Sequence, residues 1–175
     1  MPANRYLYWD SCVFSAYIGQ EPGRVDIVQA IWDDIAQTRG DKIITVSLTV
    51  AEVAYIATEK IRTPQRPRRV LDPQAEAKLD AIWDSPSVQL VDPPIQIMKM
   101  ARDLMRKAVP RDWVLKPYDA VQLATAQWVN EEIHPILVYH TYDDKLDKYA
   151  PMIGIPIERP RVLKPTQLSL PEETL

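Results

Sequence analysis

The segment that decides the fold is YLYWDSCVFSAYI, at residues 6–18. Its first four residues form a short apolar run, which is typical of a buried β-strand. Asp10 ends that run, Ser11 follows in a position to cap a helix, and the apolar residues after it predict a short helix that ends before Gly19. In open α/β sheets, ligands bind at the carboxyl ends of the strands. Asp10 is therefore the first candidate for a functional residue.

The rest of the chain continues this alternation of apolar runs and amphipathic helices. Further strands are predicted at residues 43–46, 88–91, 136–139 and 153–157, and further helices at residues 24–38, 49–59, 73–83 and 94–108 and from Pro117 onward. Strands that are continuous apolar runs and that alternate with helices predict a parallel sheet covered on both faces. The expected fold class is α/β, with a parallel five-stranded sheet flanked by helices on both faces in a single domain.

Length and composition exclude several classes of protein. The 175 residues suit one domain, and the 46% of apolar residues can form a core. The net charge is −3, from 21 Lys and Arg against 24 Asp and Glu, so any nucleic-acid site has to be a local patch. One Cys and two His rule out a disulfide framework and a Cys- or His-based metal centre. Four Gly, without GxGxxG or GxxxxGK[ST], exclude dinucleotide-binding and P-loop proteins.

No segment of the sequence predicts secretion or membrane insertion. The first residues are polar and lead directly into the first strand, without the apolar region and cleavage site of a signal peptide. No stretch approaches the roughly 18 uninterrupted apolar residues that predict a membrane span. The expected location is therefore the cytoplasm.

Three further acidic residues are expected at the same edge of the sheet as Asp10. Glu52 lies in the first turn of the helix after the second strand, and Asp143 follows the fourth strand. Asp119 lies in the first turn of the helix that leads back to the fourth strand. A helix that precedes a strand in the chain runs antiparallel to that strand. The N-terminus of the helix therefore lies at the edge where the strands end.

Four carboxylates at one edge repel each other, and a divalent cation explains why they are gathered there. Mg²⁺ and Mn²⁺ prefer oxygen ligands, and a pair of such ions can activate water and stabilise the leaving oxygen of a phosphodiester. Taken singly, each acid has another interpretation. Glu52 also completes a capping box that begins at Thr49, Asp119 also suits a helix dipole, and Asp143 and Asp144 also suit a turn.

Four segments together resemble the PIN-domain family and, in size and element order, its VapC-type toxin ribonucleases. They are YLYWDSCVFSAYI (6–18), TVSLTVAEV (45–53), LKPYDAVQLATA (115–126) and ILVYHTYDDKL (136–146). The resemblance covers roughly residues 5–157, so residues 1–157 are expected to form a PIN-like nuclease domain. Residues from about 60 to 86 add a connector and an extra helix to it, and residues 158–175 form a Pro-containing tail.

The resemblance implies a metal-dependent endoribonuclease that leaves 5′-phosphate and 3′-hydroxyl ends. It assigns metal binding and catalysis with Mg²⁺ or Mn²⁺ to Asp10, Glu52, Asp119 and Asp143, with Asp144 as an alternative to Asp143. Ser11 matches the small hydroxyl residue that commonly follows the first Asp, whereas Cys12 stands where the family often has Asn or Ser. Many members are toxins held inactive by a small antitoxin, and many form homodimers. An RNA substrate, an antitoxin partner and a homodimer are therefore expected.

Basic residues supply candidate contacts to RNA phosphates. The connector is basic and contains no acidic residue from Lys60 to Val70, and its two prolines break helices, so it is expected to be exposed. The predicted substrate-binding residues are Ser11, Lys116, Arg62, Arg66, Arg68 and Arg69. Lys60 belongs to the same basic run. A solvated loop with no role is the alternative for this segment.

Other interpretations remain for individual residues and for the whole chain. Cys12 suits packing as a small apolar residue, Trp113 is a candidate base-stacking residue, and His140 is a candidate for catalysis or substrate contact. A HAD-type phosphatase also has an Asp after its first strand, but it needs a second acid where this chain has Cys12. A non-catalytic RNA-binding or protein-interaction module is the remaining alternative, although idle clustered carboxylates only cost stability.

Overall fold

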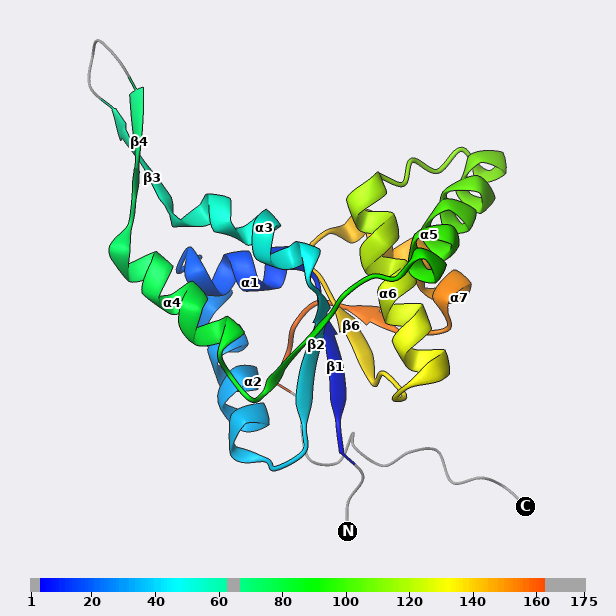
Figure 1. Ribbon diagram of the computed structural model, residues 1–175, viewed down its shortest axis with the longest axis horizontal. Coiled ribbons are helices and arrows are strands. Elements are labelled where there is room, and N and C mark those ends of the chain that lie inside the picture. Colours follow the sequence, from blue (N-terminus) through cyan, green and yellow to red (C-terminus); the bar gives the residue numbers. More distant parts are fainter. Residues whose placement is uncertain (1–3, 63–66, 163–175) are drawn as a thin grey trace.

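A five-stranded parallel sheet forms the centre of the domain (Figure 1). The computed structural model describes residues 4–62 and 67–162. The sheet has the order β5-β2-β1-β6-β7, and its strands are β1 (Tyr6–Trp9), β2 (Lys42–Val46), β5 (Val88–Val91), β6 (Val138–His140) and β7 (Ile157–Glu158). Every neighbouring pair of strands in this sheet is parallel. The carboxyl ends of all five strands therefore lie along one edge, here called the carboxyl edge.

Helices cover both faces of the sheet. They are α1 (Ser11–Ile18), α2 (Val25–Gln37), α3 (Leu48–Ala54), α4 (Pro73–Trp83), α5 (Ile95–Ala108), α6 (Pro117–Glu132) and α7 (Ala150–Ile153). Because side chains alternate along a strand, β1 contributes to two cores. Leu7 and Trp9 pack with α1, α2 and α4, whereas Tyr8 packs with α5, α6 and α7. The predicted fold class and the covering of both faces are thereby confirmed.

Three predicted elements differ from the structure by two residues or more at an end. The strand expected at residues 136–139 is β6, which begins only at Val138. The helix expected up to residue 59 ends at Ala54, and a 3₁₀ turn, η1 (Tyr55–Ala57), follows it. The strand expected at residues 153–157 is only β7, because Ile153 is the last residue of α7. Gly154 ends that helix in the left-handed conformation, with φ of 69°, which glycine adopts without steric cost.

The connector is a β-hairpin rather than an irregular loop. Strands β3 (Thr58–Arg62) and β4 (Pro67–Leu71) pair antiparallel, with Lys60 opposite Arg69. The hairpin projects away from the sheet beyond α3 and α4 (Figure 1). Arg66 lies outside the described residues, and for Lys60, Arg62, Arg68 and Arg69 the description covers the backbone alone. Of the predicted tail, residues 163–175 also lie outside the described part of the chain.

Ion pairs fix the amino end of the sheet, opposite the carboxyl edge. The Arg5 guanidinium lies 2.6 Å from Asp41 Oδ2 and 2.7 Å from Asp34 Oδ2. The backbone N–H of Arg5 also donates to Asp41 Oδ1, at 2.7 Å. Asp41 is buried, so these bonds compensate its carboxylate where β1 and β2 begin.

No helix within residues 4–62 and 67–162 has the length and apolar character needed to cross a membrane.

Candidate active site

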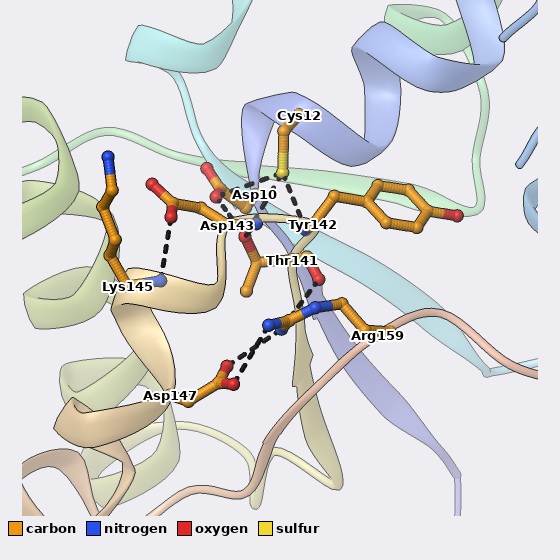
Figure 2. Close-up of polar contacts among 8 residues, drawn as sticks. All are labelled: Asp10, Cys12, Thr141, Tyr142, Asp143, Lys145, Asp147 and Arg159. Atoms are coloured by element: carbon orange, nitrogen blue, oxygen red, sulfur yellow. Dashed lines mark hydrogen bonds and ion pairs between the residues drawn. The ribbon is translucent and has the colours of Figure 1, made fainter.

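Asp10 lies at the carboxyl end of β1 and caps the N-terminus of α1 (Figure 2). Its Oδ1 accepts a hydrogen bond from the backbone N–H of Ser11 at 2.7 Å, and its Oδ2 accepts one from the Thr141 hydroxyl at 2.8 Å. The Ser11 hydroxyl lies 3.3 Å from Oδ1. Only 6% of Asp10 is exposed. The carboxylate is therefore fixed in direction before any ligand arrives.

Burial raises the pKa of Asp10 above its ordinary value, and the negative charge of Asp119 raises it further. Hydrogen bonds from Thr141, Cys12 and Ser11 favour the charged form and oppose this shift without cancelling it. The ionised carboxylate is therefore costly in the folded protein. A cation bound beside it would relieve that cost.

Thr141 joins two of the predicted site residues. It is fully buried in the loop after β6. Its hydroxyl donates to Asp10 and accepts a hydrogen bond from the backbone N–H of Asp143 at 3.0 Å. Thr141 thus orients Asp10 and the loop that carries Asp143. In the sequence this residue was only one member of the segment ILVYHTYDDKL (136–146), and nothing there identified its contact with Asp10.

Cys12 belongs to the same network (Figure 2). Its Sγ lies 3.4 Å from Asp10 Oδ2 and 3.2 Å from Thr141 Oγ1, and it accepts a hydrogen bond from the backbone N–H of Tyr142 at 3.1 Å. Burial, together with the charge of Asp10, raises the pKa of the thiol to about 12, so it stays protonated. The interpretation of Cys12 as a purely apolar packing residue was incomplete, because the thiol is also a polar neighbour of Asp10.

Arg159 supports this loop from the far side (Figure 2). Its two terminal nitrogens lie 2.9 and 3.0 Å from the two carboxylate oxygens of Asp147. One of them also donates to the Thr141 carbonyl at 3.4 Å. A bidentate pair of this kind holds both side chains in one geometry. It connects the segment after β7 to the 3₁₀ helix η3 (Asp144–Tyr149).

Asp143 and Asp144 have different surroundings. Asp143 is half-buried and caps η3, with its Oδ1 accepting from the backbone N–H of Lys145 at 2.9 Å. Its charge raises the pKa of Asp119. Asp144 is exposed. Asp143, rather than its exposed neighbour, therefore interacts electrostatically with Asp119.

Glu52 and Asp119 complete the acidic group. Desolvation raises the pKa of Glu52, and the charge of Asp10 adds to that shift. Desolvation likewise raises the pKa of Asp119, followed by the charge of Asp143 and, more weakly, that of Glu52. Lys116, which precedes α6, and Lys145 oppose the shift at Asp119. Each of the four predicted acids is thus electrostatically linked to at least one other at the carboxyl edge.

A buried chain of hydrogen bonds positions the helices that carry Glu52 and Asp119. The Tyr8 hydroxyl donates to Gln122 Oε1 at 2.8 Å, and Gln122 Nε2 donates to Thr49 Oγ1 at 2.9 Å. Thr49 Oγ1 lies 2.8 Å from Thr45 Oγ1. The residue before α3 is Ser47, so Thr49 lies inside the helix and is not its cap, and the capping-box interpretation of Glu52 was wrong. Sequence reasoning did not identify Gln122.

The donor set has the chemistry of a site for a hard cation, because its candidate ligands are carboxylate oxygens. Within the described residues, no three side chains of His, Cys, Asp or Glu converge closely enough to hold a metal ion by themselves. Mg²⁺ commonly retains several waters and is held by one or two carboxylates together with substrate phosphate. These residues fit that mode of binding, and they do not fit a closed cage made by protein alone.

His140 and Trp113, the candidates for catalysis and for base stacking, do not have the surroundings that these roles require. His140 is fully buried, and burial lowers its pKa to about 4, so its imidazole is neutral. It has no contact with solvent through which to reach a substrate. The Trp113 ring lies under two cations, Arg111 and Lys148, and packs edge-on against Tyr149. Neither residue is therefore a suitable base or stacking platform.

Replacing Thr141 with Val is expected to lower the free energy of unfolding by about 1–3 kcal/mol. The change removes the donor to Asp10 Oδ2 and the acceptor for the Asp143 N–H at a site that water does not reach. Urea denaturation measures the effect. Thr141→Ser keeps the hydroxyl and is the matched control. Equal destabilisation by Val and Ser would show that packing, and not the hydrogen bonds, explains the role of Thr141.

Comparison with known proteins places this geometry in a family. The family model described as "PIN domain" matches residues 7–151. The fold is similar to a chain in the crystal structure of VapBC2 from Rickettsia felis bound to a DNA fragment from their promoter. The TM-score is 0.62 at 14% identity, and the match covers 88% of this chain and 98% of that chain. No curated protein matches the sequence. Since the family model covers most of the chain, including the four acids, the chain belongs to the PIN domain family.

Proposed function

We propose that the protein is a metal-dependent endoribonuclease that hydrolyses RNA phosphodiester bonds. Membership of the PIN domain family supports a nuclease, a hydrolase acting on nucleic acid. The observation that carries the finer proposal is the group of four acids at the carboxyl edge, Asp10, Glu52, Asp119 and Asp143, in which burial and neighbouring charges raise the pKa values of the first three. Raised pKa values at clustered carboxylates are typical of functional sites. Mg²⁺ or Mn²⁺ is the proposed cofactor.

The roles of the residues follow from their surroundings. The bound ions would supply a nucleophilic water and offset the charge that develops on the phosphate. Asp10, held by Ser11 and Thr141, is the ligand with the most restricted geometry. Lys116 would contact substrate phosphate beside Asp119, whose pKa it already lowers. The Ser11 hydroxyl and the hairpin residues Arg62, Arg66, Arg68 and Arg69 are further proposed RNA contacts.

We further propose that this nuclease is the toxin of a toxin–antitoxin pair and acts in the cytoplasm. Support comes from the similar structure, which is a VapBC2 assembly bound to promoter DNA. By analogy, a small antitoxin would block this protein by covering the carboxyl edge or by placing a basic side chain among the acids. A homodimer is proposed on the family resemblance alone.

Cleavage of a mixed RNA pool by the purified protein tests the proposal. With Mn²⁺ we expect cleavage to products with 5′-phosphate ends, and with EDTA we expect none. Labelling of the ends with and without phosphatase treatment identifies the products. Cleavage that persists in EDTA, or products with 2′,3′-cyclic phosphate ends, would contradict the metal-dependent mechanism.

Metal binding tests the non-catalytic alternative without requiring a known RNA target. At 100 times its Kd, Mn²⁺ should stabilise the protein by about 2.7 kcal/mol, measured by urea denaturation. The variant Asp10→Asn should show much less stabilisation. If the wild type and this variant respond equally to Mn²⁺, the acids are not the metal site and a binding module becomes the better interpretation.

A further inference from the structure

The chain beyond the residues that match the family model helps to hold the loop after β6, residues 141–143. That match ends at residue 151, whereas β7 is Ile157–Glu158 and Arg159 follows it directly. Pro160 comes next and is buried. A residue before a proline is restricted to extended conformations, so the backbone of Arg159 has few alternatives. Its side chain therefore starts from a well-defined point at the end of the sheet.

The end of β7 holds Thr141 through both of its backbone groups. The Thr141 N–H donates to the Glu158 carbonyl at 3.0 Å, and the Thr141 carbonyl accepts from the Arg159 guanidinium at 3.4 Å. The hydroxyl of the same residue bonds Asp10 and the Asp143 N–H. The direction of two proposed metal ligands therefore depends on how Thr141 is attached to β7.

Arg159 also fixes η3, the helix that begins after Asp143 (Figure 2). Its two terminal nitrogens bond both carboxylate oxygens of Asp147, which lies inside η3. Asp143 caps the start of the same helix through the Lys145 N–H. A shift of η3 would move this cap with it. The guanidinium therefore limits the positions that are open to the Asp143 carboxylate.

The exposure of this ion pair argues against a mainly stabilising role. The side chains of Arg159 and Asp147 are 37% and 51% exposed. Pairs this exposed contribute little to the free energy of unfolding, because water and salt screen them and the two side chains lose entropy. A bidentate guanidinium–carboxylate pair nevertheless restricts direction strongly. The pair therefore supplies geometry more than stability, and it does so at the loop that carries the acids.

We propose that Arg159 is a positioning residue of the candidate active site. Acting through Thr141 and η3, it keeps Asp10 and Asp143 in the geometry that binds a metal ion. The role of the ion rests on the proposed function, whereas the hold on the loop is a property of the chain alone. Loss of an outer contact to metal ligands typically costs about 10- to 100-fold in metal affinity or activity. Because Arg159 acts through a further residue, we expect the lower end of that range.

Amide hydrogen exchange tests the hold on the loop without metal or RNA. In Arg159→Gln, the N–H groups of Thr141 and Asp143 should exchange about threefold faster or more, because the loop opens more readily. The matched control is Arg161→Gln, which removes a similarly exposed ion pair, with Glu158, from the same segment. It should leave both amides at the wild-type rate. Wild-type exchange in Arg159→Gln would overturn the proposal.

The affinity for Mn²⁺ tests what this geometry is for. Electron paramagnetic resonance of free Mn²⁺ gives the Kd of the full chain without RNA. The Kd should rise about tenfold in Arg159→Gln. Asp147→Asn in the Arg159→Gln background should raise it little further, because the two side chains act as one unit. Arg159→Lys keeps the charge but not the bidentate geometry, so its Kd should lie between those of the wild type and Arg159→Gln.

The sign of the effect separates geometry from charge. Arg159→Gln and Arg161→Gln each remove one positive charge, and by Coulomb attraction alone either change should strengthen the binding of a cation to the acids. Weaker Mn²⁺ binding by Arg159→Gln alone would therefore come from lost geometry. The urea midpoint should move by less than about 0.5 M in both variants, so that global unfolding does not explain the result.

The outcomes also separate this inference from the proposed enzyme. If the wild type binds no Mn²⁺ while Arg159→Gln loosens the amides of Thr141 and Asp143, the metal-dependent function fails and the hold of Arg159 on the loop remains. If the wild type binds Mn²⁺ and Arg159→Gln binds it as tightly or more tightly, the proposed enzyme remains and the positioning role of Arg159 fails.

Discussion

Replacing Asp10 with Asn is expected to reduce Mn²⁺-dependent RNA cleavage by more than about 100-fold. Substitution of groups that merely support metal ligands costs about 10- to 100-fold, and Asp10 is proposed to be a ligand itself. The amide keeps an oxygen that can accept from the Ser11 N–H, so the start of α1 should remain intact. Single-turnover cleavage of a defined RNA measures the loss. Retention of more than a tenth of the wild-type rate would exclude Asp10 as a metal ligand.

The same substitution is expected to stabilise the protein in the absence of metal at neutral pH. The pKa of Asp10 is raised in the folded state, so the folded protein binds its proton more tightly than the unfolded chain does. The charged carboxylate therefore lowers stability above the folded pKa. That loss is relieved as the pH falls through the raised pKa. Asn removes this pH dependence. The variant Asp10→Asn should therefore have the higher free energy of unfolding at pH 7, and its difference from the wild type should shrink as the pH falls to 4, as measured by urea denaturation.

The outcome for Asp10 distinguishes a functional carboxylate from a structural one. If Asp10 mainly capped α1, Asn would have little effect on stability and none on Mn²⁺ binding, because Asn is an equally good cap. A variant that is both more stable and inactive would show that the fold gives up stability to keep the charge. Such a trade between stability and function is expected at active sites.

Replacing Asp143 with Asn is expected to reduce cleavage by more than about 100-fold, whereas Asp144→Asn should change it by less than about threefold. Asp143 interacts with Asp119 and is joined through Thr141 to Asp10, whereas Asp144 is exposed. Asn at position 143 can still accept from the Lys145 N–H, so the start of η3 should be preserved. The two variants are matched, because each removes one negative charge from adjacent residues.

Cleavage rates at saturating and at limiting Mn²⁺ separate the effects of the two substitutions. A lost ligand should raise the Mn²⁺ concentration needed for half-maximal activity, whereas a change in surface charge should not. A large loss for Asp144→Asn with little for Asp143→Asn would reverse the assignment and show that the loop rearranges when metal binds.

The sequence was sufficient for features that depend on local pattern. The apolar run that ends at Asp10 correctly predicted β1, and the helix predicted at residues 73–83 is α4. The helix cap expected at Ser11 is instead Asp10, and Ser11 is the first residue of α1. The alternating order of strands and helices then predicted a parallel sheet. In such a sheet, acids that follow the strands lie at the same edge. These predictions succeeded because neighbouring residues carry the signal for a buried strand or an amphipathic helix.

The sequence was insufficient for contacts between distant residues. The bond from Thr141 to Asp10 spans 131 positions, and the bonds of Gln122 to Tyr8 and Thr49 span 114 and 73 positions. No local pattern encodes such a pair. The β3–β4 hairpin was missed for a different reason, because its strands are charged and contain Pro67, which is atypical of a strand with a buried face.

The ion pairs of Arg5 have a practical consequence for handling the protein. Arg5 is bound to Asp34 and Asp41 at the amino end of β1, at the end of the sheet opposite Asp10. A flexible linker joined ahead of Arg5 therefore departs from the side remote from the carboxyl edge. An affinity tag or a tether to a solid support placed there would leave the acids facing the solution. The immobilised protein would then be suited to capturing RNA fragments or a partner from a mixture.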